Sequence, residues 1–91
     1  MSSPFISICI PTYKRTGLLK KLLDSIQVQT FRDFEILIND NSPDDSVKEL
    51  VTAYPLLPIS YQKNEPAVTA VENGTRVMRR ANAPWIKLVH D

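Results

Sequence analysis

Apolar residues follow two different periods along the chain. Four short runs predict strands, and they span residues 5–10 (FISICI), 34–39 (FEILIN), 59–63 (ISYQK) and 85–89 (WIKLV). The first, nearly continuous and rich in Ile, is typical of a strand buried on both faces. Between them, residues 17–29, about 42–54 and 68–81 carry apolar side chains at helical spacing. The order β-α-β-α-β-α-β predicts an α/β fold of Rossmann-like type, with a mostly parallel sheet and helices on both faces.

Local signals predict where these elements begin and end. Pro11 is expected to stop the first strand, because proline cannot donate to a strand ladder. Thr16 is expected to cap the first helix, and Ser42 the second, with Pro43 at its first helical position. The third helix is predicted from a stripe of residues at helical spacing, which comprises Val68, Val71, Thr75, Met78 and Ala81.

Polar residues stand at the exit of every predicted strand. They form the segments 11–15 (PTYKR), 40–42 (DNS), 64–66 (NEP) and 90–91 (HD). Open α/β sheets bind ligands beyond the carboxyl ends of their strands, so these segments are expected to share one site. Tyr13 offers a ring on which a base can stack, and Asp40 an acceptor for a uracil imide or ribose hydroxyls. Arg15 can balance phosphate charge, and Asp91 can bind ribose or a hard divalent cation.

Each of these residues also has a purely structural interpretation. Asp40 and Asn41 are common turn formers, and Tyr13 can serve packing alone. Arg15 can belong to a solvated loop, and Cys9, inside an apolar strand, is expected to be a small core residue. The first strand is followed by no G-x-G-x-x-G motif, which disfavours a dinucleotide-binding site.

Composition narrows the class of protein. The 91 residues suffice for one domain, and 43% hydrophobic with 23% charged residues is ordinary for a globular chain. A formal net charge of +1 gives no basic field for nucleic acid. No stretch is apolar enough to span a bilayer, and the first residues lack the features of a signal peptide, so we expect a cytoplasmic protein.

Three segments together resemble the family-2 glycosyltransferases with the GT-A fold. They are ISICIPTYKR, LLKKLLDSIQVQTFRDFEILINDNSPDDS and NGTRVMRRANAPWIKLVHD, and they cover essentially the whole chain. The resemblance implies transfer of a sugar from a nucleotide-diphosphate donor, commonly a UDP-sugar, as in polysaccharide biosynthesis. It implies that Pro11, Thr12 and Tyr13 lie against the base and that Asp40 binds it. The resemblance also implies that Asn73 binds the nucleotide.

The same resemblance also implies a metal ion and indicates how much of the GT-A fold residues 1–91 contain. Asp91 falls where the family's acidic metal motif begins, which implies Mn²⁺ or Mg²⁺ bound to the donor diphosphate. Residues 1–91 are then expected to be a single, truncated nucleotide-sugar-binding domain, the N-terminal half of the GT-A fold. No catalytic residue is assigned, and the fragment alone is expected to be inactive and metal-free. The full-length protein is expected in the cytoplasm or at the cytoplasmic face of a membrane.

Three departures from the family pattern concern the donor phosphates. Lys14 stands where Asn is common, Glu72 where Arg is frequent, and Pro66 near a usual glycine. A carboxylate at position 72 would repel a diphosphate unless it points away.

The apolar strand at 85–89 is also expected to lie at an open edge of the truncated sheet, which predicts self-association.

Other functions remain possible from the sequence. A nucleotidyltransferase would need a Gly- and Lys/Arg-rich loop after the first strand, where the chain has Pro11, Thr12 and Tyr13. A receiver-type module would need paired acids at the same place. The remaining alternative is an α/β fragment or interaction module without activity.

Overall fold

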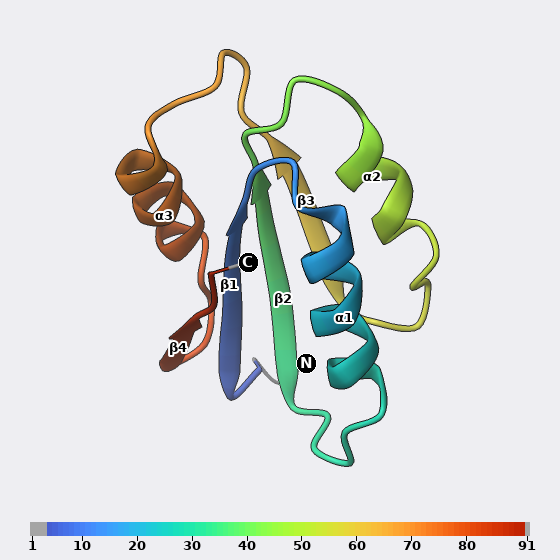
Figure 1. The fold of residues 1–91 in the computed structure, drawn as a ribbon. Coiled ribbons are helices and arrows are strands. Elements are labelled where there is room, and N and C mark those ends of the chain that lie inside the picture. Colours follow the sequence, from blue (N-terminus) through green and yellow to red (C-terminus); the bar gives the residue numbers. More distant parts are fainter. Residues whose placement is uncertain (1–3, 91) are drawn as a thin grey trace.

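The computed structural model describes residues 4–90, and its centre is a four-stranded parallel sheet of order β3-β2-β1-β4 (Figure 1). All three strand pairings are parallel. The predicted order of elements is confirmed, and the elements are β1 (Ile6–Thr12), α1 (Thr16–Gln27), β2 (Phe34–Asp40), α2 (Ser46–Val51), β3 (Ile59–Lys63), α3 (Ala70–Arg79) and β4 (Trp85–Leu88).

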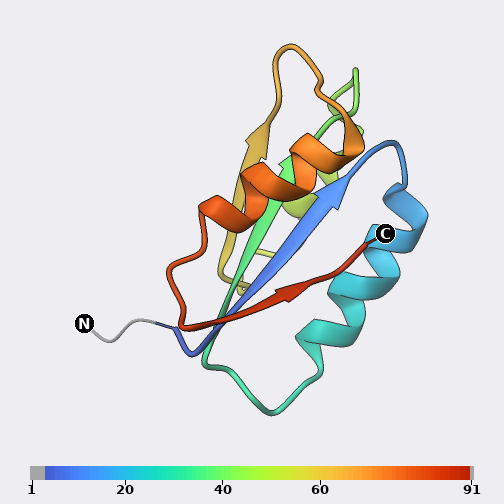
Figure 2. The same cartoon turned by 90° about the vertical axis from the view of Figure 1, so that its left-hand side faces the viewer.

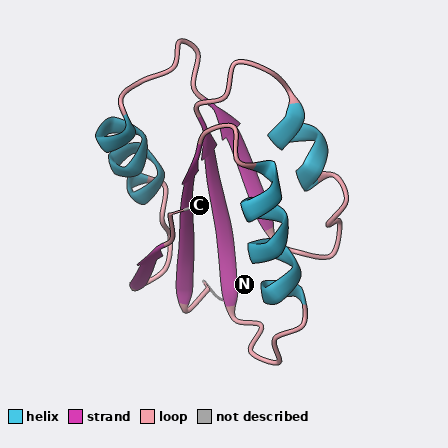
Figure 3. Ribbon diagram, in the orientation of Figure 1, coloured by secondary structure: helices cyan, strands magenta, loops and turns pink. Residues whose placement is uncertain are grey.

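Helices α1 and α2 lie on one face of the sheet and α3 on the other (Figures 2 and 3). The sheet separates two unequal apolar layers. The larger layer lies under α1 and α2, where Leu19, Leu23 and Val47 pack against strand residues such as Ile10 and Ile38. The smaller layer lies under α3 and contains Cys9, Leu37 and Val77. Cys9 is wholly buried, as predicted for a core residue. The helices therefore cover both faces of the sheet, as the alternating pattern predicted.

The prediction that Pro11 ends the first strand is wrong. β1 continues through Pro11 to Thr12, and Pro11 lies in register with Asn39 of β2. The carbonyl of Cys9 accepts from Val89 on the β4 side, and alternate residues of a strand face the same neighbour. The nitrogen of Pro11 therefore faces the β4 side, where β4 has already ended, and the missing N–H interrupts no ladder.

The predicted caps of the first two helices are also wrong. α1 begins at Thr16 itself, and the carbonyl of Arg15 accepts the bond from Leu19 N. α2 begins only at Ser46, because the hydroxyl of Ser42 is engaged elsewhere, as an acceptor for the N–H of Lys14. Residues 42–45 consequently form a loop at the exit of β2.

α3 is shorter than predicted and presents a different face. Thr69 caps it, with Oγ1 accepting from Glu72 N at 3.1 Å, so Val68 lies outside the helix. Val71, expected on the apolar stripe, is 81% exposed. The buried face instead contains Asn73, Gly74 and Val77, because the helix meets the sheet beside the polar strand exits.

β4 forms one edge of the sheet. It pairs with Ile6–Cys9 of β1, and all four of its residues are exposed. The longest helix among residues 4–90 has 12 residues, and no helix in this range has the length and apolar character to cross a membrane.

Candidate functional site

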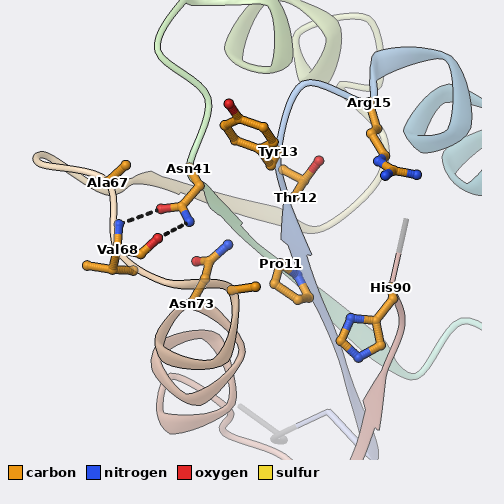
Figure 4. Close-up of a pocket in the computed structure, with 10 residues that line it drawn as sticks. Pro11, Thr12, Tyr13, Arg15, Asn41, Ala67, Val68, Asn73 and His90 are labelled. Carbon is orange, nitrogen blue, oxygen red and sulfur yellow. Dashed lines mark hydrogen bonds between the residues drawn. The ribbon is translucent and has the colours of Figure 1, made fainter.

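A hollow of about 470 Å³ opens at the carboxyl edge of the sheet (Figure 4). One wall is the exit of β1, and the facing wall is the segment that leads into α3. The lining residues are Pro11, Thr12, Tyr13, Arg15, Asn41, Ala67, Val68, Ala70, Asn73 and His90. The structure thus brings together five of the residues assigned from the sequence, which are Pro11, Thr12, Tyr13, Arg15 and Asn73.

Tyr13 divides this hollow from a second one. The second hollow measures about 360 Å³ and lies between Tyr13 and the exit of β3, at Lys63 and Asn64. The Tyr13 side chain is 52% exposed, and the ammonium of Lys14 lies 5.3 Å from its ring centroid. A half-exposed ring between two hollows is available to stack on a flat ligand.

The backbone beside Tyr13 is held in an uncommon conformation. Lys14 has φ of 52°, in the left-handed backbone region that residues other than Gly and Asn rarely adopt. Its N–H donates to the Ser42 hydroxyl at 2.8 Å, which ties the exit of β1 to the exit of β2. The Asn that is common here in the family pattern would suit this φ better than Lys does.

Asp40 lies beneath the hollow and not on its wall. Its side chain is wholly buried, with Oδ1 accepting from Ser42 N at 2.8 Å and Oδ2 accepting from the Tyr61 hydroxyl at 2.5 Å. Burial and the hydrogen bond to this carboxylate raise the pKa of Tyr61, which stays a neutral donor. The predicted contact between Asp40 and a base stays a prediction, and in this structure Tyr61 and Ser42 use the carboxylate.

Asn73 also directs its polar atoms into the protein. Its Oδ1 accepts from Asn64 Nδ2 at 2.7 Å, and its Nδ2 donates to the Asn39 carbonyl at 3.2 Å. Asn73 lines the hollow but is only 3% exposed. Its assignment as a nucleotide ligand stays a prediction, and the observed contacts are structural.

Arg15 and His90 also line the hollow. Arg15 is exposed, and among residues 4–90 it has no carboxylate within ion-pair distance. His90 lies in the segment that follows β4, on the same side of β1 as Arg15 (Figure 4). Glu72 forms an ion pair with Arg76 at 3.4 Å and is not among the lining residues, so its charge is partly compensated.

The residues described provide no metal site of their own. Asp91, the predicted metal ligand, lies outside the described residues. Within residues 4–90 no group of three His, Cys, Asp or Glu side chains could hold an ion.

Sequence reasoning missed two parts of the site. Ala67 and Val68 form the wall opposite Tyr13, but the helical spacing placed Val68 inside a helix. The sequence pattern predicts Tyr61, the partner of Asp40, only as a strand residue. Its pairing with Asp40 depends on strand register, because Tyr61 lies beside Ile38, two residues before Asp40 in β2, and no local pattern encodes that register.

Comparison with known proteins gives a consistent family match. The model for "Glycosyl transferase family 2" matches residues 7–89. Validoxylamine A glucosyltransferase of Streptomyces hygroscopicus subsp. jinggangensis (strain 5008) is 34% identical over 89 residues, 91% of this chain and 21% of that protein. Abequosyltransferase RfbV of Salmonella typhimurium is 41% identical over 64 residues, 65% of this chain and 19% of that protein. The chain spans 16 to 28% of the length of the first curated relatives that it matches.

Solved structures confirm the predicted GT-A fold. S. aureus TarS has a TM-score of 0.83 at 20% identity, over 94% of this chain and 27% of that one, and a further TarS structure is in complex with UDP. Mannosyltransferase PcManGT from Pyrobaculum calidifontis, in complex with GDP-Man and Mn²⁺, has a TM-score of 0.72 at 23% identity, over 90% of this chain and 26% of that one.

Proposed function

This chain belongs to glycosyl transferase family 2, and from that premise we propose that its carboxyl-edge hollow binds the nucleotide of a UDP-sugar donor. The observation that carries the proposal is the half-exposed ring of Tyr13, which stands between two hollows at the exits of β1, β2 and β3. TarS, which shares this fold, was solved in complex with UDP, and PcManGT with GDP-Man, so nucleotide binding is known for this fold and the choice of UDP is part of the proposal.

Each side chain at the hollow has a proposed role. The base stacks on Tyr13, while Pro11 and Thr12 form the floor beside it. Arg15, exposed at the same hollow, binds the diphosphate with its guanidinium donors. Such charge-assisted bonds suit a ligand whose charge is concentrated on phosphate oxygens.

Asp40 is proposed to recognise the edge of the base. An ionised carboxylate offers about four lone-pair sites, and Ser42 N and the Tyr61 hydroxyl occupy two of them. Because Asp40 is wholly buried, the base can reach it only if Tyr61 or the loop at 42–45 shifts. The imide N–H of uracil would donate to this carboxylate, which distinguishes uracil from adenine, whose ring nitrogens only accept.

The cation and the transfer reaction concern the whole protein. PcManGT was solved with GDP-Man and Mn²⁺, which supports a divalent cation that would bind through Asp91 and neutralise the donor diphosphate. We propose that the whole protein transfers a sugar from this donor and works in the cytoplasm or at the cytoplasmic face of a membrane. We further propose that residues 1–91 alone form the nucleotide-binding part and transfer no sugar.

Calorimetric titration with UDP, GDP and ADP, with and without Mn²⁺, tests the proposal. UDP is expected to bind more tightly than the purine nucleotides, and Arg15→Ala is expected to weaken binding of UDP more than that of uridine. Lys48→Ala, an exposed cation on α2, is the matched control and should change neither affinity. Equal binding of all three nucleotides, or none, would refute the uracil preference.

A further inference from the structure

The side chain of Asn41 connects the exit of β2 to the wall of the hollow opposite Tyr13. Its Nδ2 donates to the Val68 carbonyl at 2.7 Å, and its Oδ1 accepts from the Val68 N–H at 3.0 Å (Figure 4). The amide thus pairs with both polar groups of one backbone residue, as a neighbouring strand would. Only an Asn-type side chain of this length offers a donor and an acceptor side by side.

Asn41 is one member of a buried asparagine cluster, which we define as Asn41, Asn64 and Asn73. Asn64 Nδ2 donates to Asn41 Oδ1 at 2.9 Å and to Asn73 Oδ1 at 2.7 Å. The three side chains are between 3% and 7% exposed. Among the residues described, no buried side-chain N or O atom lacks a hydrogen-bond partner, so the cluster is fully satisfied. A satisfied buried network of this kind fixes one arrangement of the segments that it joins.

The cluster joins three segments that are far apart in the sequence. Asn41 follows β2, Asn64 follows β3, and Asn73 lies in α3. The segment at 64–69 connects Asn64 to the helix that contains Asn73. Ala67 and Val68 of this segment form the wall of the hollow. In the described structure this wall is held to the sheet by the Asn41 amide, and by the capped start of α3 at Thr69.

We propose that Asn41 is a positioning residue for nucleotide binding, which fixes Val68 and so holds the wall of the hollow at a set distance from Tyr13. The inference rests on the proposed function, and it gives Asn41 a role that the family resemblance does not assign. Asn41 lines both hollows, yet its Oδ1 and Nδ2 are directed to Val68 and Asn64, so it acts through Val68 and not by contacting the ligand. A preformed wall spares the ligand the cost of ordering this segment on binding.

The test compares Asn41→Asp with the unaltered 91-residue chain, using UDP titration and amide hydrogen exchange. A carboxylate at position 41 still accepts from Val68 N but faces the Val68 carbonyl without a proton to donate. We expect the dissociation constant for UDP to rise about tenfold. We also expect faster exchange at the amides of residues 67–69, with the amides of β1 and β2 unchanged.

The matched control is Asn82→Ala. It also removes an asparagine hydrogen bond, from Nδ2 to Glu35 at 3.1 Å, but at the opposite end of the sheet. It should leave both the UDP affinity and the exchange at 67–69 unchanged. Asn41→Ala serves as a second variant, should the carboxylate prevent folding.

The outcomes separate this inference from the proposed function. If the unaltered chain binds no UDP, the proposed function fails and the inference fails with it. If the unaltered chain binds UDP and Asn41→Asp binds equally well, only the inference is overturned. If affinity falls while exchange at 67–69 is unchanged, the loss does not act through Val68 and the positioning role is wrong.

Discussion

The hydroxyl of Tyr61 donates to Oδ2 of the fully buried Asp40 at 2.5 Å. This side-chain hydrogen bond connects β3 to β2 in addition to their backbone pairing, at the point where both strands reach the site. The buried carboxyl group accepts from two donors, the Tyr61 hydroxyl and Ser42 N. The residue proposed to recognise a base is therefore also a structural anchor of the strand exits, and its two roles can be separated by substitution.

Removing the donor should destabilise the fold. Tyr61→Phe leaves one carboxylate oxygen buried without its partner, and we expect the free energy of unfolding to fall by about 1.5–3 kcal/mol, the range for a hydrogen bond to a charged group. Tyr54→Phe is the control, because Tyr54 donates to Asp24 at the same 2.5 Å but the Asp24 side chain is 49% exposed. Water can replace that bond, so the free energy of unfolding, measured by urea denaturation, should fall clearly less in Tyr54→Phe than in Tyr61→Phe.

Neutralising the acceptor should weaken nucleotide binding. In Asp40→Asn the side-chain oxygen can still accept from Ser42 N, and the Tyr61 hydroxyl can rotate to accept from the new amide, so the fold should persist. The charge that would attract an imide N–H is lost, and we expect UDP affinity to fall about tenfold by calorimetry. Asp45→Asn, in the neighbouring loop, should change it little. An unchanged affinity in Asp40→Asn would remove Asp40 from the site.

The backbone at position 14 offers a test of strain beside the site. Lys14 adopts φ of 52°, a region that costs an ordinary L-residue about 1–2 kcal/mol. Lys14→Gly should therefore keep or raise the free energy of unfolding, by up to about 1 kcal/mol, although glycine also loses more entropy on folding. Arg15→Gly, where φ is −122°, should lower it. Thermal unfolding of both variants decides the point, and a stability loss in Lys14→Gly equal to that in Arg15→Gly would show that φ at Lys14 stores no strain.

The sequence predicted the types and order of the elements because each depends on a local period of apolar residues. Ile10 and Ile36 in the apolar runs and Leu19 and Leu23 on the helical stripe are buried as expected. The strand exits, with Tyr13 and Asp40, could also be placed, because parallel strands end at the same edge of a sheet.

The errors concern features that depend on which neighbour a residue meets. Pro11 stays in its strand because β4 ends before reaching it, and this is a matter of relative strand length. Ser42 caps no helix because the N–H of Lys14 competes for its hydroxyl across the sheet. The pairing of Asn41 with Val68 joins residues 27 positions apart, and no local pattern encodes such a partner.

Glu35 should make stability depend on pH in the acid range. Burial raises the pKa of Glu35, but hydrogen bonds from Ser7 and Asn82 outweigh it, and the pKa lies below the ordinary value. A carboxyl whose pKa is lowered by folding stabilises the protein fully above its unfolded pKa, about 4.3, and loses that contribution as pH falls through the folded value. In Glu35→Gln, the decline of stability below about pH 4.5 should be shallower than in the unaltered protein. Glu49→Gln, exposed on α2, is the control, and equal slopes in all three proteins would contradict the prediction.

The open edge at β4 should cause residues 1–91 to self-associate. Trp85, Ile86 and Leu88 are 62%, 48% and 37% exposed, so an apolar strand lies at the edge of the sheet. The N–H groups of Trp85 and Val89 donate to the carbonyls of Phe5 and Cys9, and strand alternation therefore directs the N–H groups of Ile86 and Leu88 outward. Exposed apolar edges of this kind pair with other chains.

Substitution at position 86 can show whether the edge itself makes the contact. Ile86→Pro removes an outward donor but no bond to β1, so it should leave the fold intact and abolish association in sedimentation at micromolar concentration. Ile86→Thr lowers apolarity at the same position while keeping the N–H, and it should still associate. Association should also slow hydrogen exchange at the amides of Ile86 and Leu88, because a second strand would then cover them. A monomer with rapid exchange at both amides would show that the edge does not pair, and association of both variants alike would place the contact on another surface.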